Sequence, residues 1–226
     1  MPTTPEGGRV TAITPQRRTP DRLNIFLDGA YAFSLSTALV ADEGLAPQQE
    51  LSAAGVAALL AADTFSKATD AAIRLLAVRP RSERELRDRL RRKEYTPDAI
   101  AAALEKVRGW GYLDDIEFAR FWVAQREAHR PRGQRLLRYE LAQKGVDGDV
   151  IIATIAEAEI DETAAALALA RARLHTYRGL DPVVVRRRLG AFLARRGYGY
   201  DVIGPTLGTL LGELYDLNDG LAAGDH

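Results

Sequence analysis

The stretch RPRSERELRDRLRRKEYTPDAI at residues 79–100 returns 51 positions later as RPRGQRLLRYELAQKGVDGDVI at residues 130–151. The two stretches share ten identities in 22 positions, more than their common composition would produce. A weaker third copy follows a further 52 positions on, at Arg187, Leu189, Leu193, Arg196, Gly197 and Ile203. Self-similarity at a fixed period is typical of repeat proteins, so residues 66–215 are interpreted as three copies of a unit of about 50 residues.

Each copy is predicted to form three helices. In the first copy, Ala68, Ala72 and Leu75 follow the spacing of an amphipathic helix. This helix ends before Pro80, because the residue ahead of a proline is disfavoured in helical conformation. Leu86 starts the apolar seam of the second helix, and the third begins at a Thr-Pro pair. A unit this small buries only a thin core, so we expect the copies to stack into an elongated array.

The first 65 residues have a different pattern. Two strand-like runs, 23–27 and 30–35, flank Asp28-Gly29, which is a strong hairpin signal. The pattern predicts strands near 9–14, 22–27 and 30–35 and helices at 36–43 and 52–62. The predicted fold is mainly α: three tandem three-helix repeats stacked as an elongated array, preceded by a small N-terminal β-hairpin or meander. The expected domains are 1–65, 66–115, 116–160 and 161–215, followed by an acidic tail, 216–226.

Composition excludes several classes of protein. The 226 residues include no cysteine, which excludes disulfides, thiolate catalysis, iron–sulfur clusters and cysteine zinc sites. No apolar run approaches the roughly 20 residues that span a bilayer, and the N-terminus has no apolar signal core. We therefore expect a soluble cytoplasmic protein.

The charges cancel in total but are segregated along the chain. Lys plus Arg and Asp plus Glu are 31 each, yet residues 79–93 hold eight cations against three acids, a net of +5. Residues 126–144 hold six against two (+4), and residues 171–196 hold eight against one (+7). Ion pairs at i, i+4 on a solvated helix face would explain much of the first cluster, but in the third Asp181 alone faces eight cations. The clusters favour binding of a periodic polyanion or of a periodic acidic protein surface.

Candidates for chemistry are weak. Asp114 and Asp115 could hold a divalent cation, but Asp114 with Glu117 three residues later better fits a helix N-cap. His129 and His175 have no ligand or triad partner at suitable spacing and are interpreted as surface residues. An aromatic group is interpreted as core between the first two copies rather than as a base-stacking platform: Trp110, Tyr112, Phe118, Phe121 and Trp122. We predict no enzyme activity, no cofactor and no metal.

Several motifs together resemble the RecX family of bacterial recombinase regulators. They are Gly-Tyr-Leu-Asp-Asp at 111–115, Pro-Arg-Gly at 131–133, Lys-Gly-Val at 144–146 and the hairpin at 24–35. The resemblance extends over residues 9–215 and is weakest in the third copy. It implies a non-enzymatic regulator that binds the RecA–DNA filament and inhibits RecA ATPase, strand exchange and coprotease activities, in DNA repair, homologous recombination and the SOS response.

The expected partners are the RecA filament and DNA of any sequence, single- or double-stranded, with no membrane, and the chain is expected to be a monomer. Two alternatives stay open: a helical-repeat protein that binds DNA directly, and a generic protein adaptor whose arginine excess is only compositional. The predicted contact residues are the basic positions Arg81, Arg84, Arg87, Arg91, Arg132, Arg135, Arg138, Arg187, Arg188, Arg195 and Arg196.

Overall fold

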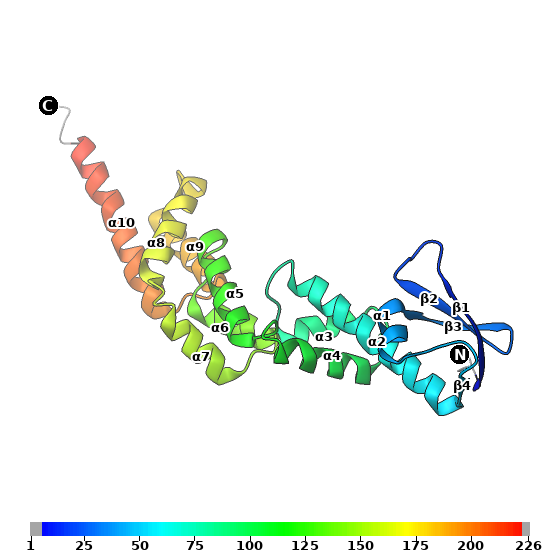
Figure 1. The fold of residues 1–226 in the computed structure, drawn as a ribbon. Helices are drawn as coiled ribbons and strands as arrows, with labels where there is room; N and C mark the ends of the chain where they lie inside the picture. Colours follow the sequence, from blue (N-terminus) through cyan, green and yellow to red (C-terminus); the bar gives the residue numbers. More distant parts are fainter. Residues whose placement is uncertain (1–5, 223–226) are drawn as a thin grey trace. The chain divides into compact units, whose positions relative to one another are not determined.

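The computed structural model describes residues 6–222, which form two compact units (Figure 1). The first unit contains Met1–Arg79 and Glu85–Leu113. The second contains Pro80–Arg84 and the chain from Asp114 onward. The short segment 80–84 therefore packs with residues that follow it by thirty positions or more.

A four-stranded antiparallel sheet opens the first unit. Its order is β3-β2-β1-β4, with β1 (Gly8–Pro15), β2 (Arg22–Leu27), β3 (Ala30–Ser36) and β4 (Glu50–Leu51). The first three strands confirm the predicted meander, and β4 is an added two-residue edge. Asp28 and Gly29 both have positive φ, at 49° and 84°, as the tight turn between β2 and β3 requires. Ile25, Phe33 and Leu35 of this sheet pack against the helices that follow.

Two helices cover this sheet: α1 (Thr37–Asp42) and the N-terminal part of α2 (Ala53–Leu76). The separate helices expected at 52–62 and around Ala68 are wrong, because α2 is one continuous helix. No glycine or proline follows Gly55 within it, and its alanine-rich sequence favours helix throughout. The predicted domain boundary at residue 65 lies within α2 and stays a prediction.

The remainder of the first unit completes a three-helix repeat with the C-terminal part of α2. Its other helices are α3 (Glu83–Arg91) and α4 (Pro97–Gly109). Thr96 caps α4 by accepting from the backbone N–H of Ala99, and Pro97 occupies the first turn, as predicted. Leu86, Leu90 and Leu104 form the buried core with the alanines of α2.

The second unit contains two further three-helix repeats. The first has α5 (Asp115–His129), α6 (Gln134–Gln143) and α7 (Gly148–Glu157). The next has α8 (Glu162–Leu174), the 3₁₀ turn η1 (His175–Tyr177), α9 (Pro182–Arg195) and α10 (Tyr200–Ala222). Leu137 and Leu141 of α6 and Leu189 and Leu193 of α9 are fully buried at equivalent positions. The three helical repeats and the N-terminal sheet are confirmed, whereas their stacking into an elongated array stays a prediction.

Two corrections concern the ends of helices. The predicted acidic tail overlaps α10 as far as Ala222, and residues 223–226 lie outside the described residues. Trp110 and Tyr112 are 49% and 60% exposed, so the prediction that they form core is wrong. They follow the end of α4 on either side of Gly111, and Leu113 points inward instead. Phe118 is fully buried, but in the core of its own repeat rather than between the first two copies as predicted.

Candidate functional site

A pair of equivalent hydrogen bonds joins successive copies of the repeat within the second unit. The Ser82 hydroxyl donates to the Lys144 carbonyl at 2.7 Å, and the Gly133 N–H donates to the Arg196 carbonyl at 2.9 Å. The donors are 51 positions apart and the acceptors 52, which are the offsets of the repeat. In both cases the residue ahead of one copy's second helix bonds the end of the next copy's second helix.

A second pair of bonds joins the same copies, with donors 51 positions apart and acceptors at the start of the next copy's first helix. The N–H of Glu83 donates to a carboxylate oxygen of Asp115 at 3.0 Å, and the N–H of Gln134 donates to Glu162 at 2.8 Å. Asp115 and Glu162 each begin the first helix of the next copy, where a negative charge is favourable. These bonds satisfy helix N-terminal N–H groups that have no partner within their own helix.

The two adjacent carboxylates singled out from the sequence have separate structural roles. Asp114 caps α5, accepting from the N–H groups of Ile116 at 2.7 Å and Glu117 at 3.3 Å, which confirms the N-cap prediction. Asp115 bonds Glu83 as described above. Among the residues that the structure describes, no three histidine, aspartate or glutamate side chains gather as a metal site would require.

Glycine is required where successive copies approach. Gly145 and Gly197 have φ of 81° and 91°. A Cβ on Gly145 would lie 2.9 Å from the Cβ of Arg84, and one on Gly197 would overlap Leu136. The equivalent position of the first copy is Glu94, which tolerates a φ of 63° without glycine. A positive φ at the end of the second helix therefore does not by itself require glycine. Glycine is found at this position in the two copies where a neighbouring copy lies too close for a Cβ.

The contact at Gly133 gathers four arginines, which we name the junction cluster: Arg130, Arg132, Arg173 and Arg196. Burial lowers the pKa of the Arg196 guanidinium, and the charges of Arg132, Arg173 and Arg130 lower it further. Because a guanidinium stays protonated in proteins, the lowered pKa reflects burial of the Arg196 charge first and repulsion from its arginine neighbours second, not loss of the charge. A bound anion would relieve that repulsion.

Aromatic rings hold several of these cations in place. Arg173 and Arg196 lie 4.6 and 5.1 Å from the centre of the Phe192 ring. Cation–π contacts of this kind order a guanidinium while leaving its N–H groups able to bind an anion. A parallel arrangement surrounds Trp122, with Arg126 at 4.2 Å and Lys144 at 4.7 Å from the ring centre.

The carboxylate of Glu140 interacts with several donors in this region. It accepts from Trp122 Nε1 at 2.9 Å and from Arg126 Nε at 2.7 Å, and it lies 3.8 Å from Arg132 Nε. Arg132 Nε has no hydrogen bond among the described residues, since 3.8 Å is too long for one. The region therefore carries an excess of positive charge that its own acids do not balance.

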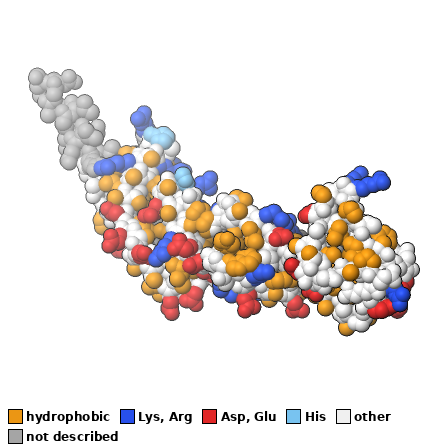
Figure 2. Space-filling view, in the orientation of Figure 1, with side chains coloured by type: hydrophobic (Ala, Val, Ile, Leu, Met, Phe, Trp, Pro, Cys, Tyr) orange, Lys and Arg blue, Asp and Glu red, His pale blue; other side chains and the backbone are white. Residues whose placement is uncertain are grey.

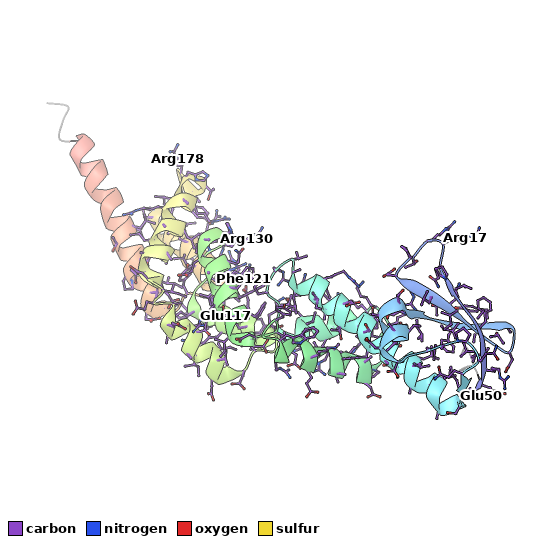
Figure 3. The ribbon with its side chains drawn as sticks, viewed as in Figure 1. Arg17, Glu50, Glu117, Phe121, Arg130 and Arg178 are labelled. Carbon is purple, nitrogen blue, oxygen red and sulfur yellow. The ribbon has the colours of Figure 1, made fainter. Side chains whose placement is uncertain are left out.

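The figures locate this excess. Figure 3 shows Arg130, at the end of α5, and Arg178, beyond η1, projecting from the same end of the second unit. Figure 2 shows Lys and Arg side chains beside the histidines at this end, whereas acidic side chains gather lower on the same unit. Neither His129 nor His175 is buried, in agreement with their interpretation as surface residues.

The predicted contact residues fall into several environments. Arg81 is 7% exposed and lies inside the protein, whereas Arg84 is exposed. Arg87 and Arg91 belong to α3 in the first unit, and Arg91 lies 3.8 Å from Asp88. The positions exposed in the second unit besides Arg84 are Arg135, Arg138, Arg187, Arg188 and Arg195. The structure brings Arg132 and Arg196 together; a stripe common to all three copies stays a prediction.

Three members of this region are absent from the sequence prediction: Arg130, Arg173 and Phe192. Arg130 could have been found, because it opens the second Arg-Pro-Arg motif of the repeat. Arg173 had no signal beyond the net charge of residues 171–196. Its proximity to Arg196 depends on how α8 packs on α9.

The fold and this surface define a class: a helical-repeat protein with an arginine-rich surface region and a small β-sheet at its N-terminus. No helix within residues 6–222 has both the length and the apolar character needed to cross a bilayer.

Comparison with known proteins gives the family. Four models match in order: the Regulatory protein RecX N-terminal domain at 8–52, and the RecX first, second and third three-helix domains at 68–106, 114–155 and 159–205. The chain belongs to the RecX family.

Relatives match along most of their length. A Regulatory protein RecX of Clostridium botulinum (strain Eklund 17B / Type B) is 32% identical over 212 residues, which is 92% of this chain and 99% of the relative. One of Bacillus velezensis is 34% identical over 200 residues, 88% of this chain and 76% of the relative. A crystal structure of regulatory protein RecX superposes with a TM-score of 0.69 at 25% identity, covering 86% of this chain and 96% of the other. The crystal structure of RecX from Lactobacillus salivarius also supports the fold, with a TM-score of 0.59 at 22% identity. The superposition covers 66% of this chain and 97% of that structure.

Proposed function

We propose that this chain is a non-enzymatic regulator that binds the RecA–DNA filament and lowers RecA ATPase, strand exchange and coprotease activities. Its relatives are named regulatory proteins. The observation that carries the proposal is the junction cluster, in which the half-buried Arg196 lies close to Arg130, Arg132 and Arg173. A nucleoprotein filament offers the regularly spaced anions that such a surface would bind.

The chemistry of the cluster fits phosphate. A guanidinium presents N–H groups in a planar fork that matches phosphate oxygens two at a time. The ring of Phe192 pre-orders Arg173 and Arg196, so less conformational entropy is lost on binding. Phosphate binding by several arginines is independent of sequence and weakens steeply with salt.

We assign the predicted residues different parts. Arg132 and Arg196 are proposed as anion contacts, together with Arg130 and Arg173. Arg84, Arg135, Arg138, Arg187, Arg188 and Arg195 are exposed and are proposed as further contacts, as are Arg87 and Arg91 of the first unit. Arg81 is buried, so we propose that it supports the segment ahead of α3 and contacts the filament indirectly.

The test is a titration of this protein into RecA with single-stranded DNA and ATP, following ATP hydrolysis and strand exchange. We expect both to fall with added protein. The variant Arg132→Gln/Arg196→Gln should require about tenfold more protein for the same inhibition. Arg120→Gln is the matched control, because Arg120 is an exposed arginine of α5 already neutralised by Glu117 at 2.8 Å and Glu157 at 3.1 Å.

The alternatives give different results. A protein that acts on DNA alone would bind naked DNA and filaments equally at about 0.15 M salt, which would contradict the filament proposal. A generic adaptor would keep its activity in the double variant. If RecA turnover is unchanged at saturating protein, the proposed regulation is wrong.

A further inference from the structure

A groove of about 410 Å³ runs along the surface of the third repeat between α9 and α10. Small or apolar residues line it from both helices, including Gly190 and Ala194 of α9 and Ile203, Gly204 and Leu207 of α10. Arg186 and Arg187 line the same groove, and Tyr200 stands exposed beside it. None of these residues belongs to the junction cluster.

The groove lies where small side chains in the third repeat replace large ones in the second. With the offset of 52, Gly190 and Ala191 occupy the positions of Arg138 and Tyr139, and Gly204 occupies that of Ile152. Tyr139 and Ile152 are exposed on the corresponding face of the second repeat. The second repeat therefore carries larger side chains, Arg138 among them, at the positions where the third repeat carries glycine or alanine.

The charge along the groove has one sign. Arg186, Arg187 and Arg188 are exposed on α9 and form no ion pair with any described residue. An occupant that carries carboxylates would therefore meet two cations of the groove lining, Arg186 and Arg187, that form no ion pair with a described residue. Its apolar side chains would lie on Ile203 and Leu207 at the bottom of the groove.

We propose that the α9–α10 groove docks a short acidic segment of a protein partner, with apolar side chains in the groove and carboxylates on Arg186 and Arg187. This inference rests on the proposed function, in which the partner is the protein component of the filament. The apolar side chains at the bottom of the groove would not stabilise a bound phosphate backbone. Nucleic-acid bases bind by stacking on aromatic rings, and Tyr200 is the one aromatic residue that lines this groove. The groove and the junction cluster thus divide recognition between protein and nucleic acid.

The decisive variant places a large side chain in the groove. Gly204 has open space around a Cβ, but the ring of Pro205 disfavours helical conformation at a preceding residue that carries a Cβ, so we expect Gly204→Leu to fold with a lower melting temperature than the wild type. Gly212→Leu makes the same change on α10 about two turns away, at a glycine that also has open space. Thermal unfolding followed by circular dichroism confirms that both variants fold.

Binding is measured on two probes, a RecA–ATP–single-stranded DNA filament and the same DNA without RecA. We expect Gly204→Leu to weaken filament binding about tenfold while DNA binding and the Gly212→Leu control stay at wild-type levels. Arg186→Glu should weaken filament binding as well, because it places a carboxylate beside an acidic segment.

The outcomes separate the two proposals. If wild-type protein binds the filament and Gly204→Leu binds it equally well, the groove proposal is wrong and the proposed function stands. If Gly204→Leu also weakens binding to naked DNA, the groove binds nucleic acid, and the proposal that it docks a protein segment is wrong. If Arg186→Glu binds the filament as tightly as wild type, the segment is not acidic. If the wild type does not bind the filament at all, the proposed function itself fails.

Discussion

The buried hydroxyl of Ser82 donates a 2.7 Å hydrogen bond to the carbonyl of Lys144, 62 residues further along the chain. Gly133 and Arg196 repeat this relationship in the next copy, with a backbone N–H in place of the hydroxyl. One docking geometry is thus used twice with different donor chemistry. The positions of the acceptors, at the ends of α6 and α9, determine where the nearby arginines lie.

Removing the Ser82 hydroxyl tests the first of these contacts. We expect Ser82→Ala to lower the free energy of unfolding by about 1–2 kcal/mol, because the Lys144 carbonyl loses this donor in a site that water does not readily reach. Urea unfolding measures the change. Ser66→Ala, on α2, is the control and should be neutral or slightly stabilising, since alanine favours helix. Equal effects of the two variants would mean that the bond contributes nothing to stability.

The glycine at the second contact should be intolerant for two reasons. Gly197→Ala places a Cβ against Leu136 and adds the penalty of a positive φ, so we expect a loss of about 2–3 kcal/mol. Gly179 has a φ of 79° but nothing within 4 Å of a Cβ, so Gly179→Ala should cost about 1 kcal/mol from conformation alone. Chemical denaturation compares the two, and a Gly197→Ala loss no larger than that of Gly179→Ala would show that the close contact is unimportant.

Glu94 offers the converse change. It holds the equivalent position in the first copy with a φ of 63° and is exposed. Glu94→Gly should therefore stabilise the protein, or at worst leave it unchanged, because glycine adopts this conformation without a steric penalty. A melting temperature that falls clearly below the wild-type value would contradict this expectation.

Asp63 should make the stability of the first unit depend on acid pH. Burial raises the pKa of this carboxyl, but bonds from Arg22 at 3.1 Å and Lys67 at 2.6 Å outweigh burial, and the net pKa is lowered. A lowered folded-state pKa adds stability above the unfolded value of about 3.9, and this stability is lost as the pH falls through the folded value.

The variant Asp63→Asn should lower the free energy of unfolding by about 3 kcal/mol at pH 7, since it leaves Arg22 partly buried without its carboxylate. Denaturation curves from pH 7 to pH 2 should show the difference between variant and wild type shrinking below about pH 4. Asp88→Asn, at an exposed pair 3.8 Å from Arg91, serves as control and should change little. A difference that is constant with pH would contradict the assignment to this carboxylate.

Tyr198 should affect stability in alkaline solution. Its hydroxyl is buried with no hydrogen-bond partner among the described residues, and burial, with a contribution from Glu162, raises its pKa to about 12. Unfolding lets the phenol ionise near its ordinary value of 10.0, so the wild type should lose stability as the pH rises from 10 toward 12.

Tyr198→Phe should remove this loss and stabilise the protein by about 1 kcal/mol at neutral pH, because an unsatisfied buried hydroxyl is eliminated. Unfolding curves at pH 7 and at alkaline pH measure both effects. Tyr139→Phe, at an exposed tyrosine of α6, is the control and should leave stability nearly unchanged. A destabilised Tyr198→Phe would reveal a hydrogen bond to this hydroxyl.

Local sequence determined the elements of this protein. The spacing of Leu86 and Leu90, the Asp28-Gly29 turn and the Asp114 cap each act within a few residues, so conformational preferences along the chain are enough to predict them. The offset of 51 identified the repeat without any knowledge of packing.

Tertiary structure decided which elements meet. Arg132 and Arg196 are 64 positions apart, and nothing local brings them together; the hydrogen bond from Gly133 does. Trp110 is as aromatic as Phe118, yet it lies at the surface because it follows the end of its helix. Periodicity defines the inner face of a helix, but which other faces are covered depends on contacts between residues far apart in the sequence, and those contacts create the charged cluster and the groove.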